Sequence, residues 1–366
     1  MKKTFFNIVI VSLIAFTWSS CLEKIELDIP EANQDNIAIQ GKLTYGDPSV
    51  VEVTISKIFD FTGGQSLIVV KEATLIDESG NEVELEEGVQ GNYSWMFSDS
   101  DPIQIQIGQS YQMRIVTFNN STYLSTFEPL VDVPKAEDLS FEIVQREEID
   151  PITGDIANLD FLQFSVSTPL TAEGATERSR LFWQFESTYE ITDSPLLPSE
   201  DPKTCYITSL LNPGVVQTVN GNDFESNSLV NYPIYERNIG SNFAQGYMLT
   251  VFQRSLGRDA YNYWDQVGQS VERDGNMFEA PAGKILSNFV NVDDPNEDVF
   301  GYFYATVEDV IRVKVNPEDV GNPGMLCPPN VPPPPGGGCP VLVCCDCLNP
   351  GPIGESTLQQ PIWWEE

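Results

Sequence analysis

Six cysteines in the second half of the chain are the residues whose type and spacing are best suited to chemistry. They are Cys205, Cys327, Cys339, Cys344, Cys345 and Cys347. Cys344 and Cys347 have the spacing of half a zinc site. Two of the other thiolates, from Cys327 and Cys339, would complete a tetrahedral centre. Because their number is even, the six thiols could instead form disulfide bonds, and the compartment in which the protein folds decides between the two.

The seventh cysteine, Cys21, indicates that compartment. Met1-Lys2-Lys3, an apolar run from Phe5 to Trp18 and the small pair Ser19-Ser20 precede it. The run is shorter than the roughly 20 residues that cross a bilayer core, so residues 1–20 are predicted to be a signal peptide. Ser19-Ser20-Cys21 resembles a bacterial lipobox, in which the cysteine is acylated, although Trp18 replaces a Leu-like residue. We therefore predict lipidation of Cys21, with ordinary secretion as the alternative.

Export favours disulfides over a thiolate metal site, because exported proteins fold under oxidising conditions. We therefore predict no metal site, and nothing around Cys344 and Cys347 resembles the βαβ unit of a redox-active pair. Spacing does not choose among the possible pairings. If all six thiols pair, however, Cys205 must bond to a cysteine at position 327 or later. On the chain-entropy model, closure of so long a loop contributes about 4–5 kcal/mol.

The composition excludes several classes of function. The chain of 366 residues has no histidine, which rules out a Ser-His-Asp or Cys-His nucleophile and a histidine general base. Its formal net charge of −35 repels phosphate backbones, so nucleic acid is not an expected partner. A carboxylate pair could hydrolyse glycans, but 54 Asp and Glu residues offer too many candidates to choose one pair. We predict no catalytic residue and no cofactor.

Two acidic clusters offer several oxygen ligands to a hard cation such as calcium. They are residues 150–155, which contain Asp150 and Asp155, and residues 293–298, which contain Asp293, Asp294 and Glu297. Neither cluster has the spacing of a twelve-residue calcium loop. Solvated turns are the preferred interpretation of both.

Short alternating segments predict an immunoglobulin-like β-sandwich over residues 37–134. Alternation of apolar and polar residues, or a short β-rich run, occurs at 37–43, 51–56, 73–77, 83–85, 93–97 and 123–127. Half-buried strands have this period of two. After a Gly turn, Tyr111, Met113 and Ile115 lie on one face, as in the penultimate strand of immunoglobulin-like domains; an ordinary antiparallel strand is the alternative. The proline of Val133-Pro134, followed by charged residues, is predicted to mark the domain boundary.

Residues 135–320 are predicted to form a second, larger β-rich domain with one helix. Its strand candidates are 139–144, 161–166, 181–190, 247–253, 299–305 and 311–315. Ser255 is expected to cap a helix from Leu256 to about Arg273, because apolar residues recur there at three- and four-residue intervals. Tyr263-Trp264 could be a sugar-stacking platform, but packing in the core is the preferred interpretation. Residues 21–36 are predicted to be a lipidated tether.

The last segment, residues 321–366, is predicted to be a Cys/Pro/Gly-rich tail. Pro332–Pro335 and Gly336–Gly338 lie within it and favour an extended and then flexible chain. The whole protein is therefore expected to be mainly β: an N-terminal sandwich, a larger β-rich domain with one helix, and this tail.

Short motifs spread over nearly the whole mature chain match one known family. They are the lipobox at Cys21, Gly91-x-Tyr93, Gly108-x-x-Tyr111-x-Met113-x-Ile115, Tyr123-Leu124-Ser125, Val133-Pro134, Phe182-Trp183, Ser255-Leu256-x-x-x-Ala260-Tyr261-x-Tyr263-Trp264, Gly275-x-x-Phe278-Glu279-x-Pro281, Asn288, Gly301-Tyr302-Phe303, Cys344-Cys345-Asp346-Cys347 and Pro361-x-Trp363. In this order of features the chain resembles the Bacteroidota outer-membrane lipoproteins collected as domain-of-unknown-function family 4249. The resemblance implies an outer-membrane setting, often alongside TonB-dependent transporters. It implies no established activity.

Three classes of function remain after these exclusions. The leading hypothesis is a non-enzymatic lipoprotein, held on the outer membrane by Cys21, that binds a TonB-dependent barrel transporter or its ligand. The alternatives are a structural or adhesive surface protein, stiffened by calcium, and a carboxylate-based enzyme acting on glycans. Glu23, Glu26 and Asp28 resemble the acidic surface-export signal of Bacteroidota lipoproteins, although Lys24 lies between them. We therefore expect the protein to face the cell exterior.

Overall fold

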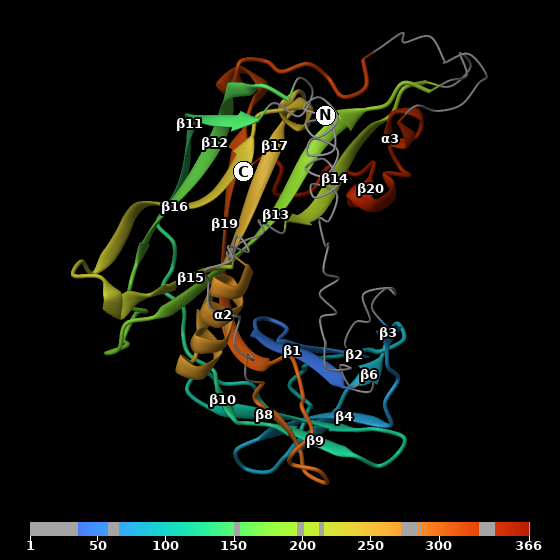
Figure 1. Ribbon diagram of the computed structural model, residues 1–366, viewed down its shortest axis with the longest axis vertical. Coiled ribbons are helices and arrows are strands. Elements are labelled where there is room, and N and C mark those ends of the chain that lie inside the picture. The colour runs from blue at the N-terminus through green and yellow to red at the C-terminus, as the bar shows by residue number, and fades with distance from the viewer. Residues whose placement is uncertain are drawn as a thin grey trace, which may run out of the picture. The chain divides into compact units, whose positions relative to one another are not determined.

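The computed structural model describes residues 36–57, 66–149, 154–195, 201–211, 216–271, 285, 287–328 and 341–365. Within these ranges the protein is mainly β, as the sequence predicts, with strands in three sheets (Figure 1). Its helices there are α2 (Arg258–Val271) and the single turn α3 (Leu342–Cys345). Residues 36–366 form one compact unit.

The largest sheet has eleven strands and runs through most of the described chain. Its order is β20 (Glu355–Thr357), β14 (Thr204–Leu211), β13 (Arg180–Thr192), β17 (Tyr247–Leu256), β19 (Phe303–Val315), β1 (Ile37–Tyr45), β2 (Val50–Lys57), β7 (Asn92–Met96) and β6 (Glu86–Glu87), with β15 (Gln217–Asn220) paired to β13 and β3 (Ser66–Leu67) paired to β2. The pairing of β1 with β19 is parallel, and every other pairing is antiparallel.

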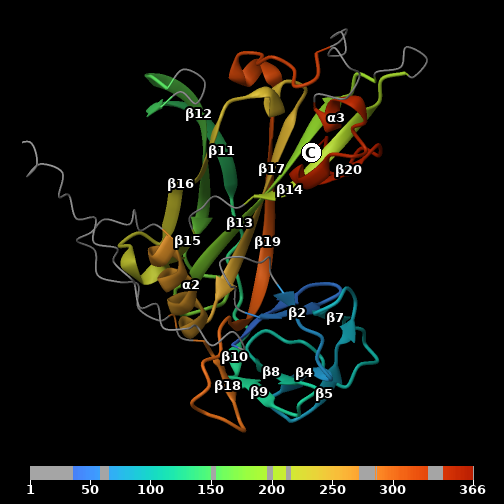
Figure 2. The ribbon, with the colours of Figure 1, turned by 45° about the vertical axis from the view of Figure 1, so that its right-hand side comes forward.

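Two smaller sheets cover parts of this one. The six-stranded sheet consists of β18 (Phe289–Asn291), β9 (Thr122–Ser125), β8 (Ser110–Val116), β4 (Glu72–Asp77) and β5 (Glu82–Glu84), with β10 (Glu128–Pro129) paired to β8. The three-stranded sheet consists of β11 (Asp138–Ile149), β12 (Ile156–Pro169) and β16 (Ser228–Asn238). Figure 2 shows the three long strands of this last sheet side by side.

The N-terminal sandwich forms because its strands alternate as the sequence predicts. Ile39 and Leu43 of β1 are fully buried, and so are Tyr111, Met113 and Ile115 of β8. These side chains belong to one hydrophobic cluster that joins the two sheets. Burial of one face of each sheet is the main contribution that holds such a sandwich together.

A second sandwich follows the same rule with larger side chains. Phe164 of β12 lies 6.4 Å from Tyr247 of β17 between ring centroids, and Tyr235 of β16 lies 5.1 Å from Phe185 of β13. All four side chains belong to the main hydrophobic cluster or pack against it. Trp183 is also buried there.

The boundary expected at Val133-Pro134 does not separate two independent sheets. β19 and β18 lie late in the chain, yet they pair with β1 and β9 of the N-terminal sandwich. Next to the crossover, the buried side chain of Gln253 donates hydrogen bonds to the carbonyl of Pro134 (2.7 Å) and to Thr168 Oγ1 (2.9 Å). The chain at Pro134 therefore crosses from one sheet layer to another, and the sheets on either side of it are joined by strand pairing.

Two local expectations differ from the structure near this crossover. Residues 299–305 and 311–315, predicted as two strands, belong mostly to the single strand β19. The polar residues between these ranges have partners in other parts of the chain: Glu308 pairs with Arg254, and Asp309 accepts a hydrogen bond from the backbone N–H of Ala136. Ser255 does not cap a helix but is the penultimate residue of β17, where its buried hydroxyl donates to the carbonyl of Val131 (2.5 Å).

Candidate functional site

A cavity of about 380 Å³ lies where the helix α2 meets the shared sheet, and we call it the aromatic pocket. Its lining residues are Gln40, Gly41, Lys42, Glu52, Thr54, Gln184, Tyr263, Trp264, Tyr302 and Tyr304. They come from five segments of the chain: β1, β2, β13, α2 and the start of β19. The site therefore depends on the long-range pairing of β19 with β1.

The floor of the aromatic pocket is the polar face of the hairpin formed by β1 and β2. Gln40 and Lys42 alternate with buried residues along β1, so they point away from the main core. Register places Lys42 opposite Glu52 and Gln40 opposite Thr54. Lys42 Nζ lies 3.5 Å from a carboxylate oxygen of Glu52, which makes an ion pair on the floor.

Aromatic side chains from α2 and from the start of β19 form the wall. The Trp264 ring stacks on Phe182 with centroids 5.0 Å apart and planes 13° apart, and meets the Tyr304 ring edge to face at 5.9 Å. Tyr263 lies 4.6 Å from Tyr302 between ring centroids. These rings belong to a small cluster that is separate from the main core.

A buried polar network fixes Tyr302 from behind. The Tyr302 hydroxyl donates to a carboxylate oxygen of Glu128 (2.8 Å), which also accepts from the Asn288 side chain (3.1 Å). Asn288 in turn bonds to both the N–H and the carbonyl of Phe303. Burial raises the pKa of Glu128 above its usual range, while the hydrogen bonds from Tyr302 and Asn288 oppose that rise.

A second ion pair lies beneath the pocket. Arg254 Nε donates to a carboxylate oxygen of Glu308 (2.7 Å), and the same guanidinium donates to Gln184. Burial lowers the pKa of Lys42, and the positive charge of Arg254 lowers it further, whereas Glu52 acts in the opposite direction. Both cations near the pocket thus have a carboxylate partner.

The lining of the aromatic pocket combines aromatic rings and hydrogen-bonding side chains with few charged groups. Glu52 is the single carboxylate among the lining residues of the aromatic pocket. Hydrolysis of glycosidic bonds in most families requires two carboxyl groups across a cleft, one as acid and one as base or nucleophile. A floor of hydrogen-bonding side chains and a wall of aromatic rings instead describe a pocket for a small ligand.

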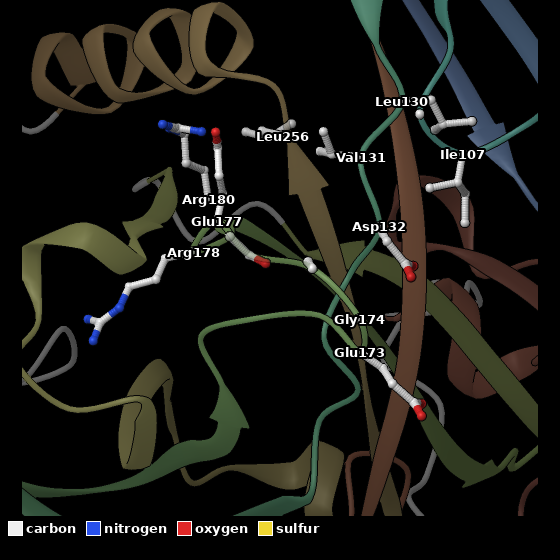
Figure 3. A pocket seen from close by; sticks show the side chains of 13 residues that line it. Ile107, Leu130, Val131, Asp132, Glu173, Gly174, Glu177, Arg178, Arg180 and Leu256 are labelled. Carbon is white, nitrogen blue, oxygen red and sulfur yellow. The ribbon is translucent and has the colours of Figure 1, made fainter.

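A second cavity, of about 350 Å³, lies between the loop after β10 and the loop that joins β12 to β13, and we call it the loop pocket. Figure 3 shows the Asp132 and Glu173 carboxylates on one side and the guanidinium groups of Arg178 and Arg180 on the other. Arg178 is used structurally, because it donates to the carbonyls of Gly221 and Phe224. None of the polar side chains that line the loop pocket is buried.

Disulfide bonds, which the sequence predicts, occur in the tail, and one of them links the tail to the body. Cys205 of β14 bonds to Cys347, and Cys327 bonds to Cys344. Cys345 is disulfide-bonded as well, and Cys339 lies outside the described residues.

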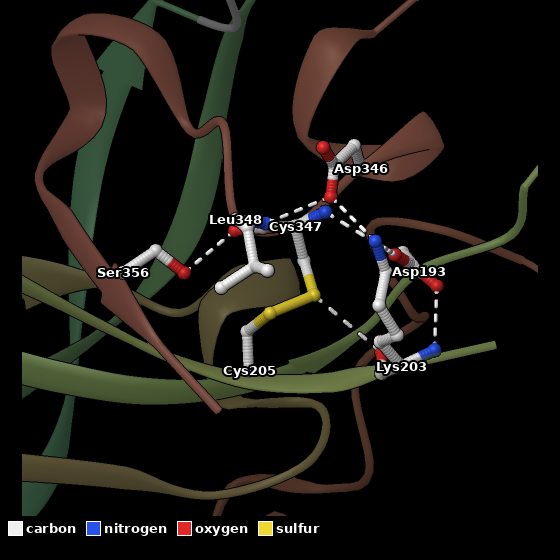
Figure 4. Close-up of polar contacts among 7 residues, drawn as sticks. All are labelled: Asp193, Lys203, Cys205, Asp346, Cys347, Leu348 and Ser356. Carbon is white, nitrogen blue, oxygen red and sulfur yellow. Dashed lines mark hydrogen bonds and ion pairs between the residues drawn. A yellow bond between two sulfur atoms is a disulfide. The ribbon is translucent and has the colours of Figure 1, made fainter. Parts of the chain in front are cut away.

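Polar contacts surround the Cys205–Cys347 bond (Figure 4). The buried Asp193 side chain accepts from the N–H groups of Lys203 (2.7 Å) and Cys347 (3.2 Å). Lys203 Nζ donates to Asp346 at 2.6 Å, and this contact lowers the pKa of the Asp346 carboxyl. Beyond the disulfide, β20 pairs with β14, so the tail adds an edge strand to the large sheet.

The end of the tail is also docked on the body. The Trp364 side chain is buried, its carbonyl accepts from Lys314 Nζ (3.0 Å), and its ring lies 5.1 Å from that of Tyr206. Arg312 lies over the Trp363 ring at 5.0 Å, a cation–π contact. Two aromatic anchors thus hold the last residues against the large sheet.

The acidic cluster at 293–298 forms a hydrogen-bonded turn. Asp293 accepts from the N–H of Thr122 (2.8 Å), and Glu297 accepts from the Tyr123 hydroxyl (2.9 Å). In the part of the chain that the structure describes, no group of three or more Cys, Asp or Glu residues is arranged to hold a metal ion. Residues 150–153 of the other cluster lie outside that part.

Cys21 and the leader before it also lie outside the described residues, and so does the motif from Gly275 to Pro281. Among the described helices, none has the length and apolar character needed to span a bilayer.

For Tyr263-Trp264 the sequence favoured packing in a core, and both side chains do pack against the small hydrophobic cluster, although they also line the aromatic pocket. The other parts of the pocket were not identified from the sequence. Tyr302 is in one of the short motifs, yet its sequence neighbours give no sign that it meets Tyr263. Lys42 and Glu52 alternate with apolar residues, which is typical of any half-solvated strand face. The alternation of polar and apolar residues along β1 and β2 predicts on which face of the hairpin these side chains lie. It does not predict that α2 packs against that face.

Comparison with known proteins agrees with the motif pattern. A search of curated proteins found no match. The family model described as "Domain of unknown function (DUF4249)" matches residues 23–312. That range includes every residue that lines the aromatic pocket. Since the match covers well over half of the sequence, the chain belongs to the DUF4249 family.

Proposed function

We propose that this protein is an outer-membrane lipoprotein, anchored through Cys21, that serves as a non-enzymatic binding subunit beside a TonB-dependent transporter. The observation that carries the binding role is the aromatic pocket, which combines stacked rings with a hydrogen-bonding floor and has one carboxylate in its lining. Such a site can hold a ligand, but it lacks the paired carboxylates of most glycan hydrolases.

The anchoring role rests on the sequence before and after Cys21. The leader and Ser19-Ser20-Cys21 support acylation, and more than one acyl chain gives stable membrane attachment. If residues 22–36 act as the predicted tether, their length would allow a reach of up to about 50 Å, at roughly 3.3–3.6 Å per residue. This reach would let the body of the protein lie beside a neighbouring barrel.

The anchor is tested by substitution at the modified residue. Cells that produce the protein would be labelled with a palmitate analogue and separated into membrane and soluble fractions. We expect Cys21→Ala to lose the label and leave the membrane fraction. Ser19→Ala, which keeps the position small, is the matched control and should retain both. A labelled, membrane-bound Cys21→Ala protein would overturn the assignment.

The partner is tested by purification of the protein from native outer membranes in mild detergent. We expect a TonB-dependent barrel to co-purify in a stable ratio with the wild-type chain. Absence of any outer-membrane barrel from the purified complex would argue against the transporter role. Protease treatment of intact cells tests the orientation, because a chain facing the exterior should be cut under conditions that leave periplasmic proteins intact.

A further inference from the structure

We infer that the aromatic pocket binds a neutral saccharide. The inference deepens the proposed binding role by naming the class of ligand, and it rests on that role. Saccharide rings present a face of C–H groups and a rim of hydroxyls. A complementary site therefore needs an aromatic surface on one side and a set of hydrogen-bond donors and acceptors on the other.

The aromatic side of this match comes from α2 and β19. Tyr263 and Trp264 are held by contacts to Tyr302, Tyr304 and Phe182, so their ring positions are fixed before any ligand arrives. The Trp264 Nε1–H group is buried and has no hydrogen-bond partner among the described residues. Because this group is sealed from solvent, it is not part of the surface that a ligand would contact, and the aromatic side of the match rests on the rings themselves.

The polar side comes from the β1–β2 floor, where side chains with different hydrogen-bonding properties are adjacent. Lys42 donates, Glu52 accepts, and Gln40 can do both. The Gln40 and Glu52 side chains are exposed, and Lys42 is partly exposed, so these groups can reach a ligand in the pocket. Several hydroxyls of one sugar ring need donors and acceptors of this mixed kind.

The charge balance favours a neutral ligand. The whole chain carries a formal net charge of −35, yet the aromatic pocket has one cation and one carboxylate in its lining, and the two are paired. The guanidinium beneath is paired with Glu308 as well. An ionic ligand would have to break one of these pairs or leave its own charge without a partner. A neutral polyol leaves both ion pairs intact and brings no charge that needs a partner.

The size of the cavity agrees with a short saccharide. Its volume of about 380 Å³ lies near the lower end of the ~300–1,000 Å³ range of small-molecule pockets. We therefore expect one or two sugar units to contact the aromatic wall, with any further units extending into solvent.

The test is calorimetric titration of the full-length mature chain in detergent with maltose, cellobiose and xylobiose as probes. Glucuronic acid and the dipeptide Ala-Ala serve as charged comparisons. We expect binding of at least one neutral disaccharide, and about tenfold weaker binding for each of Gln40→Ala and Glu52→Gln. Both substitutions are at exposed positions, so they should not disturb folding. Glu84→Gln, at an exposed position on β5 away from the pocket, should leave affinity unchanged.

Three outcomes would overturn the inference. They are binding of no neutral disaccharide, binding of the charged probes alone, and binding that Gln40→Ala and Glu52→Gln leave unaltered. The transporter role has an independent readout in the native purification. A barrel that co-purifies with a chain that binds no saccharide would reject the ligand class and leave the proposed partner in place.

Discussion

Glu128 shows how a single residue connects the aromatic pocket to the core. Its side chain is almost completely buried, and it accepts hydrogen bonds from Tyr302, Asn288 and Thr126. Burial raises its pKa above that of an exposed carboxyl. Between the ordinary pKa and this raised pKa, the folded chain binds more protons than the unfolded chain. The contribution of Glu128 to the free energy of unfolding is therefore present at low pH and is lost as the pH rises through the raised pKa.

This pH dependence can be tested with Glu128→Gln, which removes the charge and keeps an oxygen that accepts a hydrogen bond from Tyr302. We expect the free energy of unfolding of the variant to improve relative to wild type as the pH rises from about 4 to about 8. Denaturant melts at several pH values would measure the difference. Glu142→Gln, an exposed position on β11, is the control. Parallel pH profiles for wild type and Glu128→Gln would contradict the argument.

At the level of single residues, sequence patterns predicted burial better than function. The period of two placed Tyr111, Met113 and Ile115 on the buried face of β8, as the structure has them. The sequence also singled out Tyr263-Trp264, but it could not join this pair to Lys42 and Tyr302. These residues meet only because β19 returns to pair with β1, and such a long-range contact has no local signature.

The strand β19 illustrates the same limit for elements. Its two apolar halves were predicted as separate strands, and the polar residues Glu308 and Asp309 lie between them. Their partners, Arg254 and the N–H of Ala136, come from other parts of the chain. The strand β16, which contains Pro233, was not among the predicted strands. The strand tolerates this proline since it lies at the edge of its sheet, where one N–H row needs no partner.

Gly301 is the residue that allows β19 to approach β1, and two glycine substitutions test this. Its φ is +86°, and a Cβ there would overlap the carbonyl oxygen of Ile39. Gly108 has a similar φ of +90°, but a Cβ there would meet nothing within 4 Å. We expect Gly108→Ala to lose about 1–2 kcal/mol from the backbone conformation alone. Gly301→Ala should lose about 4 kcal/mol or more, because the steric overlap is added.

Denaturant melts of the two glycine variants measure these losses. Insolubility of Gly301→Ala beside a soluble Gly108→Ala would also agree with the expectation. Equal losses would show that positive φ, and not the approach of β19 to β1, sets the requirement for glycine at position 301.

The lengths of the two disulfide-closed loops predict how much each bond stabilises the protein. Cys205–Cys347 spans 142 residues, and Cys327–Cys344 spans 17. On the chain-entropy model, loss of the first costs about 4–5 kcal/mol and loss of the second about 3 kcal/mol. We therefore expect Cys205→Ser/Cys347→Ser to melt at lower denaturant than Cys327→Ser/Cys344→Ser. The first pair should also make the tail more sensitive to limited proteolysis, because β20 would be held to β14 by few contacts.

Peptide mapping of the non-reduced wild-type chain provides the control for both variants. It should recover the linked peptides that contain Cys205 and Cys347. Recovery of Cys205 as a free thiol would contradict the assignment, and the ranking of the two variants would then lose its basis.

The whole molecule joins two sandwiches through shared sheets. β1 pairs with β19, β18 pairs with β9, and the main hydrophobic cluster includes side chains from both sandwiches. Chain segments that share backbone pairing and a core are expected to unfold together. Had the boundary at Pro134 separated two domains, each would have its own core and its own melting transition.

This architecture predicts a single calorimetric transition for residues 36–366, which form one compact unit. Calorimetric and van't Hoff enthalpies should agree within error if the sheets unfold cooperatively. Gly301→Ala, if it folds at all, should lower the melting temperature of the entire unit, because it weakens the pairing that both sandwiches share. Two transitions, with the Gly301 substitution moving only one of them, would instead mean that the sandwiches are independent. In that case the aromatic pocket would lie between two bodies that can separate, and its ligand affinity would depend on their association.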